Sequence, residues 1–404
     1  MEMINGGICA AKGFKASGVH CGIRKNREKK DLALIVSEAP AAAAAVYTQN
    51  LVKGAPLLVT KANLANGIAQ AVICNSGNAN TCNANGIEIA EQMCALVEQA
   101  AGIKACDVVV ASTGVIGQPL DITPIAAGIP PLVEALSAEG SQDAAAAIMT
   151  TDTRLKEMAV SFEVGGKVCR LGGIAKGSGM IHPNMATMLV FVTTDAAISP
   201  AMLQKALQAD VKDTFNMVSV DGDTSTNDMV TVLANGLAGN ETITEENDDY
   251  QAFCEALRVV TTYLCRCIAK DGEGATKLLT CQVTGAADEK TAKVVAKSVI
   301  CSSLLKAAMF GADANWGRVL CAIGYSGADV DVNKVDVSFA STMGEILVCQ
   351  DGAGVAFSEE EAKKILSEDE IIIDVALNCG EGQATAWGCD LTYDYVKING
   401  DYRT

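Results

Sequence analysis

Segments with helical spacing of apolar residues alternate with short apolar runs along this chain, and the alternation limits the folds that it can adopt. Residues 86–101 carry Ile89, Met93 and Leu96 at intervals of three and four, which is typical of an amphipathic helix. The apolar residues 108–111 follow and lead into a Ser-Thr-Gly turn, which predicts a short buried strand. Because this order repeats, the sequence predicts an α/β or α+β fold in which helices cover the sheets.

Helix-start signals recur in the second half of the chain. Ser199 and Pro200 suit the cap and the first position of a helix, and Thr244 is expected to open a longer one. Ser358 with Glu361 forms the pattern of a capping box. Each signal predicts a helix that begins at it or next to it.

The length of 404 residues favours two or three domains over a single core. The polar segment 281–290 marks the expected boundary, and apolar runs at 371–377 and 384–392 predict strands beyond it. We therefore expect a catalytic α/β region over residues 1–280 and a smaller C-terminal α/β domain over residues 281–404.

Charge and hydropathy argue against a nucleic-acid partner, a membrane span and a secretory signal. The formal net charge of −17 argues against nucleic acid, because nucleic-acid binders usually present a basic face. No run of about 18 or more uncharged apolar residues occurs, so no membrane span is expected. Residues 1–22 lack an apolar run after a basic patch, which argues against a secretory signal. We therefore expect a cytoplasmic protein.

Sixteen cysteines are scattered singly, mostly within apolar segments such as 71–74 and 299–301. We interpret them as small core residues of a chain kept in a reducing cytosol. Cys265 and Cys267 are a close pair, but neither of the two histidines is near them in the sequence, so no metal site is expected.

Familiar catalytic and cofactor motifs are absent from the sequence. It has no G-x-x-x-x-G-K-[ST] phosphate loop, no G-x-G-x-x-G after a strand, no H-E-x-x-H and no G-x-S-x-G elbow. The two histidines, His20 and His182, leave little room for a Ser-His-Asp triad. His182 precedes Pro183, and we interpret it as a turn residue in preference to a catalytic base. We expect no bound cofactor.

The segment 172–196 carries the candidate chemistry. Its first half is rich in glycine and polar residues, whereas Met188–Val192 is an apolar run suited to a buried strand. The two halves meet at Ala186 and Thr187. At such a junction the threonine hydroxyl can attack the preceding carbonyl, and hydrolysis of the resulting ester leaves Thr187 with a free α-amine.

The new amine can serve as the general base for the Thr187 hydroxyl. The ordinary pKa of an α-amine is near 8, so a useful fraction is neutral at pH 7 and no histidine is needed. Many proteins have Ala-Thr at the start of a strand, however, and these two residues alone also fit a plain junction between loop and strand. The pattern by itself leaves both interpretations open.

Longer blocks of sequence resemble one enzyme family. GSGMIHPNMATML (177–189) closely resembles the signature of the ornithine acetyltransferase family of arginine biosynthesis, also called glutamate N-acetyltransferase. The resemblance implies a layered α/β fold with sheets packed between helices, of the self-cleaving threonine-nucleophile type, plus a smaller C-terminal α/β domain. Further blocks resemble the family in the expected order over nearly the whole chain: DLALIVSEAPAAAAAVYTQN (31–50), NSGNAN (75–80), ASTGVIG (111–117), DGDTSTND (221–228), DGEGATK (271–277), GADANWGR (311–318) and WGCDLTYDYVKINGDYRT (387–404).

The resemblance also implies roles for individual residues. The bond between Ala186 and Thr187 is cut, the two chains stay together, and Thr187 becomes the nucleophile. Thr113 and Gly114 supply the oxyanion hole. Lys176 is the expected contact of the substrate carboxylate, and an ordered C-terminus is expected to line the site. The positions implied to bind substrate, besides Thr187 itself, are Thr150, Lys176, Glu273, Asn399 and Thr404.

The implied activity is the transfer of acetyl from N-acetyl-L-ornithine to L-glutamate through an acetyl-threonine ester, by a ping-pong mechanism. Some members of the family also take acetyl-CoA as a co-substrate and so make N-acetylglutamate. The cleaved chains of the family associate further, and a heterotetramer with two copies of each chain is expected.

Two other functions fit parts of the pattern. A related self-cleaving aminopeptidase or amidohydrolase would use the same threonine and pass the acyl group to water. A binding protein without activity is the third alternative, and the joint presence of Thr187, Thr113, Gly114 and Lys176 argues against it. Acetyl transfer measured with and without glutamate separates the first two functions.

Overall fold

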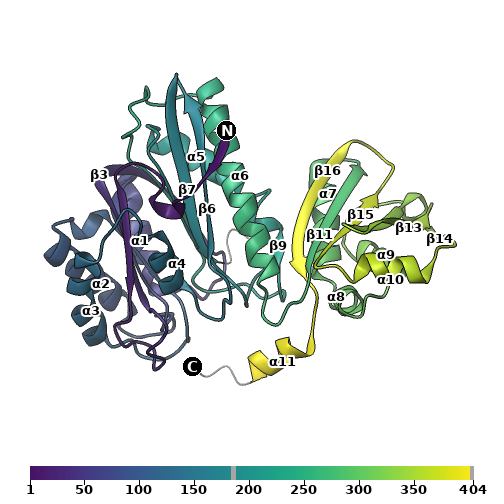
Figure 1. Ribbon diagram of the computed structural model, residues 1–404, viewed down its shortest axis with the longest axis horizontal. Coiled ribbons are helices and arrows are strands. Elements are labelled where there is room, and N and C mark those ends of the chain that lie inside the picture. The colour runs from purple at the N-terminus through teal and green to yellow at the C-terminus, as the bar shows by residue number, and fades with distance from the viewer. Residues whose placement is uncertain (183–187, 401–404) are drawn as a thin grey trace.

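The computed structural model describes residues 1–182 and 188–400. Within these residues, nine strands form one sheet and seven strands form a second. Figure 1 shows the two sheets side by side, with helix α6 (Asp248–Lys270) between them. Helices pack against both sheets, so the predicted fold class, α/β with sheets layered against helices, is confirmed.

Strand β8 (Leu189–Thr194) lies in the interior of the first sheet. It pairs antiparallel with β7 (Lys167–Lys176) and parallel with β10 (Met229–Ala234). All of its residues are buried, as the apolar run at this position predicts. The order across the sheet is β1 (Glu2–Ile4), β6 (Lys156–Val164), β7, β8, β10, β3 (Leu32–Tyr47), β4 (Ile68–Asn75) and β5 (Val108–Ser112), and β2 (Phe14–Val19) also pairs with β3.

Helices cover both faces of the first sheet. Along β3, Leu32 and Leu34 join one apolar cluster that includes helix residues, whereas Ala33 and Ile35 join a different one. Because successive residues of a strand point to opposite faces, these clusters lie on opposite sides of the sheet. The first cluster includes α2 (Gly86–Ala101) and α3 (Ile122–Glu134), and the second includes α4 (Ser141–Ile148).

The second sheet is formed mainly by the C-terminal part of the chain, and its helices include α7, which packs on β11 and β16. The order across it is β14 (Ala353–Gly354), β13 (Gly344–Gln350), β12 (Asp336–Ser341), β15 (Glu370–Ala376), β11 (Leu278–Ala286), β16 (Gly382–Cys389) and β9 (Val218–Ser219). The remaining helices are α1 (Ala55–Asn63), α5 (Pro200–Asp210), α7 (Glu289–Cys301), α8 (Ser303–Phe310), α9 (Trp316–Gly324), α10 (Glu359–Leu366) and α11 (Tyr393–Gly400).

Helix α6 joins the two halves of the molecule. It packs on β6 and β7 of the first sheet and also on β9, β11 and β16 of the second. One apolar cluster therefore runs from Val160 in β6, through Leu257 in α6, to Val283 in β11. The expected boundary between residues 280 and 281 falls inside β11, and the division into two domains stays a prediction.

Two of the three helix-start signals act as predicted. The Ser199 hydroxyl accepts a hydrogen bond from the Met202 amide at 3.4 Å, and α5 begins at Pro200. The Ser358 hydroxyl accepts one from the Glu361 amide at 3.2 Å. Both serines thus satisfy amide groups that the first turn of a helix leaves without partners.

The expected start of α6 at Thr244 is wrong. The helix begins at Asp248, and Asn247 is its cap, because the Asn247 side-chain oxygen accepts a hydrogen bond from the Tyr250 amide at 3.0 Å. Asparagine is among the strongest capping residues, and Asp248 in the first turn adds negative charge where the helix dipole favours it. In the described parts of the chain, no helix is both long and apolar enough to cross a membrane.

We predict that Phe253 in α6 contributes strongly to stability, because it is fully buried and its ring centroid lies 6.3 Å from that of Phe162 in β6. Phe253→Ala should lower the free energy of unfolding by about 3–5 kcal/mol, measured by urea denaturation. Tyr263→Ala is the control, since Tyr263 lies on the same helix with 43% of its side chain exposed. Equal losses in the two variants would contradict the packing described here.

Candidate active site

Three strand ends meet at one edge of the first sheet. Lys176 at the end of β7 pairs with Leu189 at the start of β8, and Leu189 pairs with Met229 at the start of β10. A cavity of about 270 Å³ opens at this edge. Six of the residues expected in the site line it: Thr113, Gly114, Thr150, Lys176, Glu273 and Asn399.

Ala186, Thr187 and Thr404 lie outside the described residues. Met188, which follows Thr187 in the sequence, lines a smaller adjoining cavity of about 20 Å³. Thr113 and Lys176 line both cavities. The residue that directly follows the candidate nucleophile in the sequence therefore lines this smaller cavity.

Thr113 and Gly114 form the turn that follows β5. The Thr113 amide donates to the Asn75 carbonyl at 2.9 Å, which fixes the start of the turn against β4. Gly114 has φ of +127°, and a Cβ there would lie 2.7–2.8 Å from the backbone of Gly77 and Asn78. Only glycine fits such a position.

The expected oxyanion donors are available to a ligand. Neither the Gly114 amide nor the Thr113 hydroxyl donates a hydrogen bond to any residue that the structure describes. Both residues line the cavity, and preorganised donors of this kind stabilise negative charge that develops on a carbonyl oxygen. Their role as an oxyanion hole stays a prediction.

Lys176 supplies a positive charge at the cavity wall. It is 8% exposed and forms no ion pair with any carboxylate in the described parts of the chain. A buried ammonium group without an anionic partner is costly, so a negatively charged ligand is the natural partner. This environment suits the predicted contact with a substrate carboxylate.

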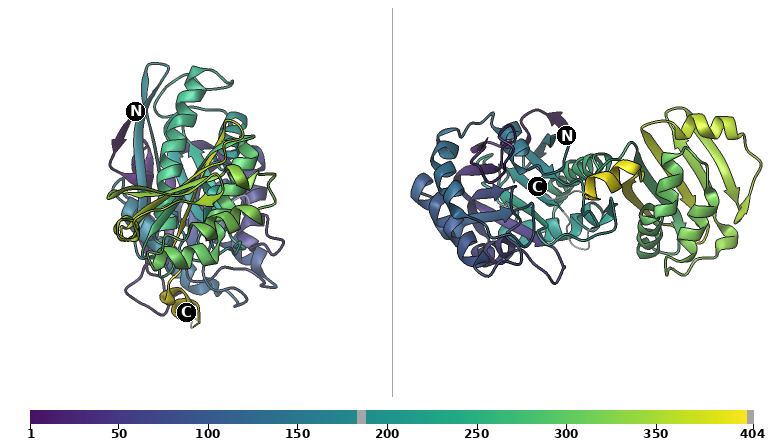
Figure 2. Two further views of the ribbon diagram at one scale, coloured as in Figure 1. Left: turned by 90° about the vertical axis from the view of Figure 1, so that its right-hand side faces the viewer. Right: turned by 90° about the horizontal axis from the view of Figure 1, so that it is seen from below.

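Glu273 and Asn399 come from distant parts of the chain and contact each other in the lining of the cavity. Glu273 follows α6, whereas Asn399 lies in α11, which Figures 1 and 2 show near the junction of the two halves. The Asn399 amide donates to Glu273 Oε2 at 2.7 Å. The Glu273 carboxylate also leaves no space for a side chain at Gly179. The end of the described chain is thus tied to the pocket, as the resemblance implies.

Asn227 is a residue at this site to which the sequence assigned no catalytic role. Its amide donates to the carbonyl oxygens of Ala79 and Ser112, at 2.5 and 2.9 Å, and its side-chain oxygen accepts from the Thr81 hydroxyl at 2.6 Å. Asn227 therefore holds the Thr113 turn against the start of β10. The polar run DGDTSTND directly before an apolar strand was the available signal.

Asp228 is a second residue that the sequence did not single out. It lines the smaller cavity and is 3% exposed, and its Oδ2 atom has no hydrogen-bond partner in the described chain. Burial raises the pKa of its carboxyl well above the usual range, although the Ser225 hydroxyl and the charge of Lys176 oppose this. The charged form of Asp228 is therefore less favourable at the wall next to Met188 than it would be in water.

His182 occupies a structural position away from the cavity lining. Its Nδ1 atom lies 3.1 Å from the Ser219 hydroxyl in β9 and 3.4 Å from the Cys301 sulfur in α7. Burial and the charge of Lys297 lower the pKa of His182 to about 4, and Asp221 opposes this shift. A neutral ring that packs the two halves together agrees with the interpretation of His182 as a structural residue.

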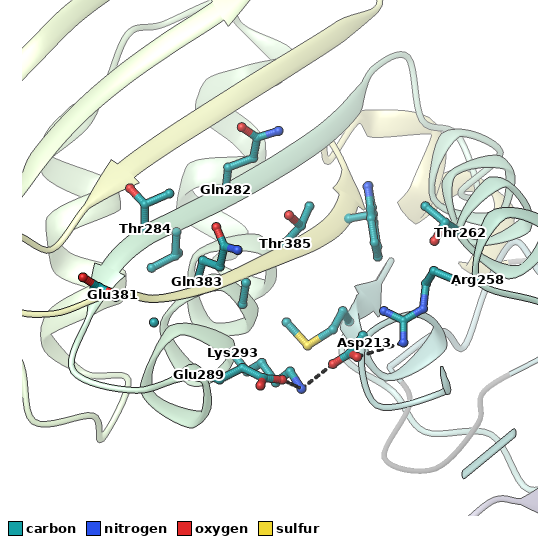
Figure 3. Close-up of a pocket in the computed structure, with 15 residues that line it drawn as sticks. Asp213, Arg258, Thr262, Gln282, Thr284, Glu289, Lys293, Glu381, Gln383 and Thr385 are labelled. Atoms are coloured by element: carbon teal, nitrogen blue, oxygen red, sulfur yellow. Dashed lines mark hydrogen bonds and ion pairs between the residues drawn. The ribbon is translucent and has the colours of Figure 1, made fainter. Parts of the chain in front are cut away.

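A larger cavity, of about 780 Å³, lies between α6 and the second sheet (Figure 3). Its two cationic side chains are already paired: Arg258 contacts Asp213 at 2.9 Å, and Lys293 contacts Asp213 and Glu289. None of the site residues expected from the sequence lines this cavity. The smaller cavity at the sheet edge is therefore the better candidate for the active site.

No group of three or more His, Cys, Asp or Glu side chains in the described ranges is arranged to hold a metal ion. The fold and the pocket together define an α/β enzyme whose site combines small polar groups with one buried lysine and one glutamate. The pocket is thus built for a small polar molecule that carries a carboxylate.

Comparison with known proteins places the chain in one family. The model of the ArgJ family matches residues 15–404, so the chain belongs to the ArgJ family. It is 53% identical over 405 residues to the "Arginine biosynthesis bifunctional protein ArgJ" of Caldanaerobacter subterraneus subsp. tengcongensis, with 100% of each chain covered. The protein of the same name from Symbiobacterium thermophilum is 53% identical over 406 residues, again with 100% of each covered. The family resemblance in the sequence is therefore confirmed.

A solved structure agrees with this assignment. The crystal structure of arginine biosynthesis bifunctional protein argJ from Bacillus halodurans is 52% identical, with a TM-score of 0.50. The match covers 52% of this chain and 98% of that chain.

We predict that His182 makes stability depend on pH. Because its pKa is about 4 in the folded protein and about 6.5 in the unfolded chain, the unfolded state binds the extra proton between these values. The stabilising contribution of the neutral ring is present above about pH 6.5 and is lost as the pH falls towards 4. The melting temperature of the wild type should fall more steeply over this window than that of His182→Gln. Parallel curves for the two proteins would contradict the assigned pKa.

Proposed function

We propose that this chain is an acetyltransferase that moves acetyl from N-acetyl-L-ornithine to L-glutamate through an ester on Thr187. The observation that carries the proposal is the buried ammonium of Lys176, which forms no ion pair with a described carboxylate and lines the pocket beside donors of Thr113 and Gly114 that bond to no described residue. Lys176 binds the substrate carboxylate, while the donors receive the carbonyl oxygen of the acetyl group. Membership of a family whose relatives are named for arginine biosynthesis supports these substrates.

The nucleophile arises by self-cleavage. The Thr187 hydroxyl attacks the Ala186 carbonyl, the C–N bond between the two residues breaks, and an ester forms in its place. Water then hydrolyses the ester, which leaves a carboxylate on Ala186 and an α-amine on Thr187. The pairing of β7 with β8 supports lasting association of the two chains, since β7 precedes the break and β8 follows it.

Acetyl transfer then takes place in two halves. The Thr187 amine accepts the hydroxyl proton while the oxygen attacks the acetyl carbonyl, and the oxyanion lies against Thr113 and Gly114. Collapse breaks the amide bond, ornithine leaves with the proton from the ammonium group, and acetyl-threonine remains. Glutamate repeats these steps in reverse: its amine attacks the ester, and Thr187 regains its proton as N-acetylglutamate leaves.

We extend the proposal to the second donor and to the assembly. The same ester forms when a thioester such as acetyl-CoA replaces N-acetylornithine, and the relatives named bifunctional support this extension. Chains 1–186 and 187–404 then form a heterotetramer with two copies of each, and the reaction takes place in the cytoplasm. The C-terminal domain, residues 281–404, contributes Asn399 and Thr404 to substrate binding.

Thr187→Ala should abolish both cleavage and transfer, because the hydroxyl acts in each reaction. On a denaturing gel the wild type should give two fragments, the second with the N-terminal sequence Thr-Met-Leu-Val, whereas the variant stays intact. Acetyl release from N-acetylornithine by the wild type should depend on glutamate. Release to water at the same rate without glutamate would contradict the transferase assignment, and an intact wild-type chain would contradict the proposed nucleophile.

Lys176→Met should raise the KM for glutamate on the order of ten- to a hundredfold, because one charge-assisted contact with the carboxylate is lost. Steady-state kinetics at saturating N-acetylornithine measure this value. Lys167→Met is the control, since Lys167 is exposed at the opposite end of the same strand and should leave KM unchanged. An unchanged KM in Lys176→Met would exclude the lysine as the carboxylate contact.

A further inference from the structure

A buried group of three charged side chains lies just outside the residues that line the pocket. Lys156 at the start of β6 places its ammonium 2.7 Å from Asp152 Oδ1 and in contact with the Asp271 carboxylate. The side chains of Lys156, Asp152 and Asp271 are 1%, 0% and 4% exposed. None of the three residues lines the 270 Å³ cavity, so they do not touch a ligand there.

The Asp152 carboxylate links two segments of the pocket wall. It accepts the Thr150 amide at 2.9 Å through Oδ2 and the Gly177 amide at 2.7 Å through Oδ1. Thr150 lines the cavity, and Gly177 directly follows Lys176. Although burial raises the pKa of Asp152, the charges of Lys156 and Lys176 lower it well below its usual range, so the carboxylate is ionised.

Asp271 links the same group to the segment that carries Glu273. Its carboxylate accepts the Thr153 amide at 3.0 Å, and its carbonyl accepts the Ser178 hydroxyl at 2.6 Å. The Ser178 carbonyl in turn accepts the Glu273 amide at 3.0 Å. Three wall segments that are far apart in the sequence are therefore held by one Asp-Lys-Asp group.

Burial of such a group of charges costs free energy, and removal of the lysine or of a carboxylate leaves a buried charge uncompensated. Core packing does not require it, because apolar clusters already cover both faces of the sheet. Its direct contacts include the backbone amides of Thr150 and Gly177, which are or adjoin residues that the proposed function assigns to the substrate. Ionic hydrogen bonds to backbone amides hold such segments within the narrow tolerance that a binding site needs.

We propose that Asp152, held in place by Lys156, is a positioning residue that sets Thr150 and Lys176 for the carboxylate of the amino-acid substrate. The inference rests on the proposed function for the identity of that substrate. Asp152 acts without touching the ligand, so its loss should weaken binding of N-acetylornithine and glutamate alike, since both occupy the same pocket in turn.

The test is the steady-state kinetics of Asp152→Asn in the full, self-cleaved enzyme, with N-acetylornithine and glutamate each varied. We expect KM to rise roughly tenfold for both substrates while kcat changes less than about threefold. Asp210→Asn is the matched control: Asp210 is equally buried and is paired with Arg258 at 2.7 Å, but it lies in α5 outside the pocket. The control should melt at a lower temperature and keep the wild-type KM.

A double-mutant cycle then separates positioning from general loss of structure. If Asp152 acts through Lys176, the fold-increase in KM of the double variant should be much smaller than the product of the fold-increases measured for Asp152→Asn and Lys176→Met alone. The proposal would be overturned if the double variant's fold-increase in KM equalled the product of the two single ones. It would also be overturned by a wild-type KM in Asp152→Asn, or by the same rise of KM in Asp210→Asn.

A second variant covers the case in which Asp152→Asn does not fold. Lys156→Arg keeps a positive charge between the two carboxylates but replaces a point charge by a planar fork, so it should shift Asp152 and raise KM for both substrates. An unchanged KM in Lys156→Arg would overturn the proposal. Absence of acetyl transfer in the wild type would instead contradict the proposed function, and the two failures are therefore distinguishable.

Discussion

The pairing of β8 with β7 and β10 is the interaction on which the rest of the site depends. It sets Lys176, Leu189 and Met229 side by side, and so brings three segments that are remote in sequence to one sheet edge. The hydrogen bonds between β7 and β8 also cross the proposed cleavage point, since β7 precedes it and β8 follows it. A buried central strand is a stable anchor because its backbone groups are paired on both sides and its side chains are covered.

The charged side chains at this edge of the sheet are complementary to the charges of a small zwitterionic ligand. Lys176 is buried without an anionic partner in the described chain, while Lys156 next to it is compensated by two carboxylates. We propose that the two lysines have different tasks: Lys176 binds a substrate carboxylate, and Lys156 holds the pocket wall in shape. Glu273 adds a negative charge to the pocket lining and is held by Asn399. A zwitterionic amino acid or its acetylated form meets complementary charge in such a pocket.

The sequence predicts the fold class, the strand after Thr187 and two of the three helix starts for which it carries a signal, because these depend on local periodicity and capping. The start of α6 was missed, since Thr244 and Asn247 are both capping residues and only the tertiary path of the chain chooses between them. Six site residues were predicted through family resemblance, and the structure brings them together. Asn227 and Asp152 were not predicted, because hydrogen bonds of their side chains join segments that are up to 148 and 25 positions apart. Hydrophobic periodicity carries no information about polar contacts of that range.

The central claim is that Thr187 carries the acetyl group between substrates, and intact-mass spectrometry tests it most directly. The wild-type enzyme is incubated with N-acetylornithine in the absence of glutamate, quenched in acid, and its two fragments are weighed. The account predicts one added acetyl group on the fragment 187–404, none on the fragment 1–186, and loss of the label when glutamate is supplied before the quench. Turnover without an acetylated fragment, or an acetyl group on the fragment 1–186, would contradict it.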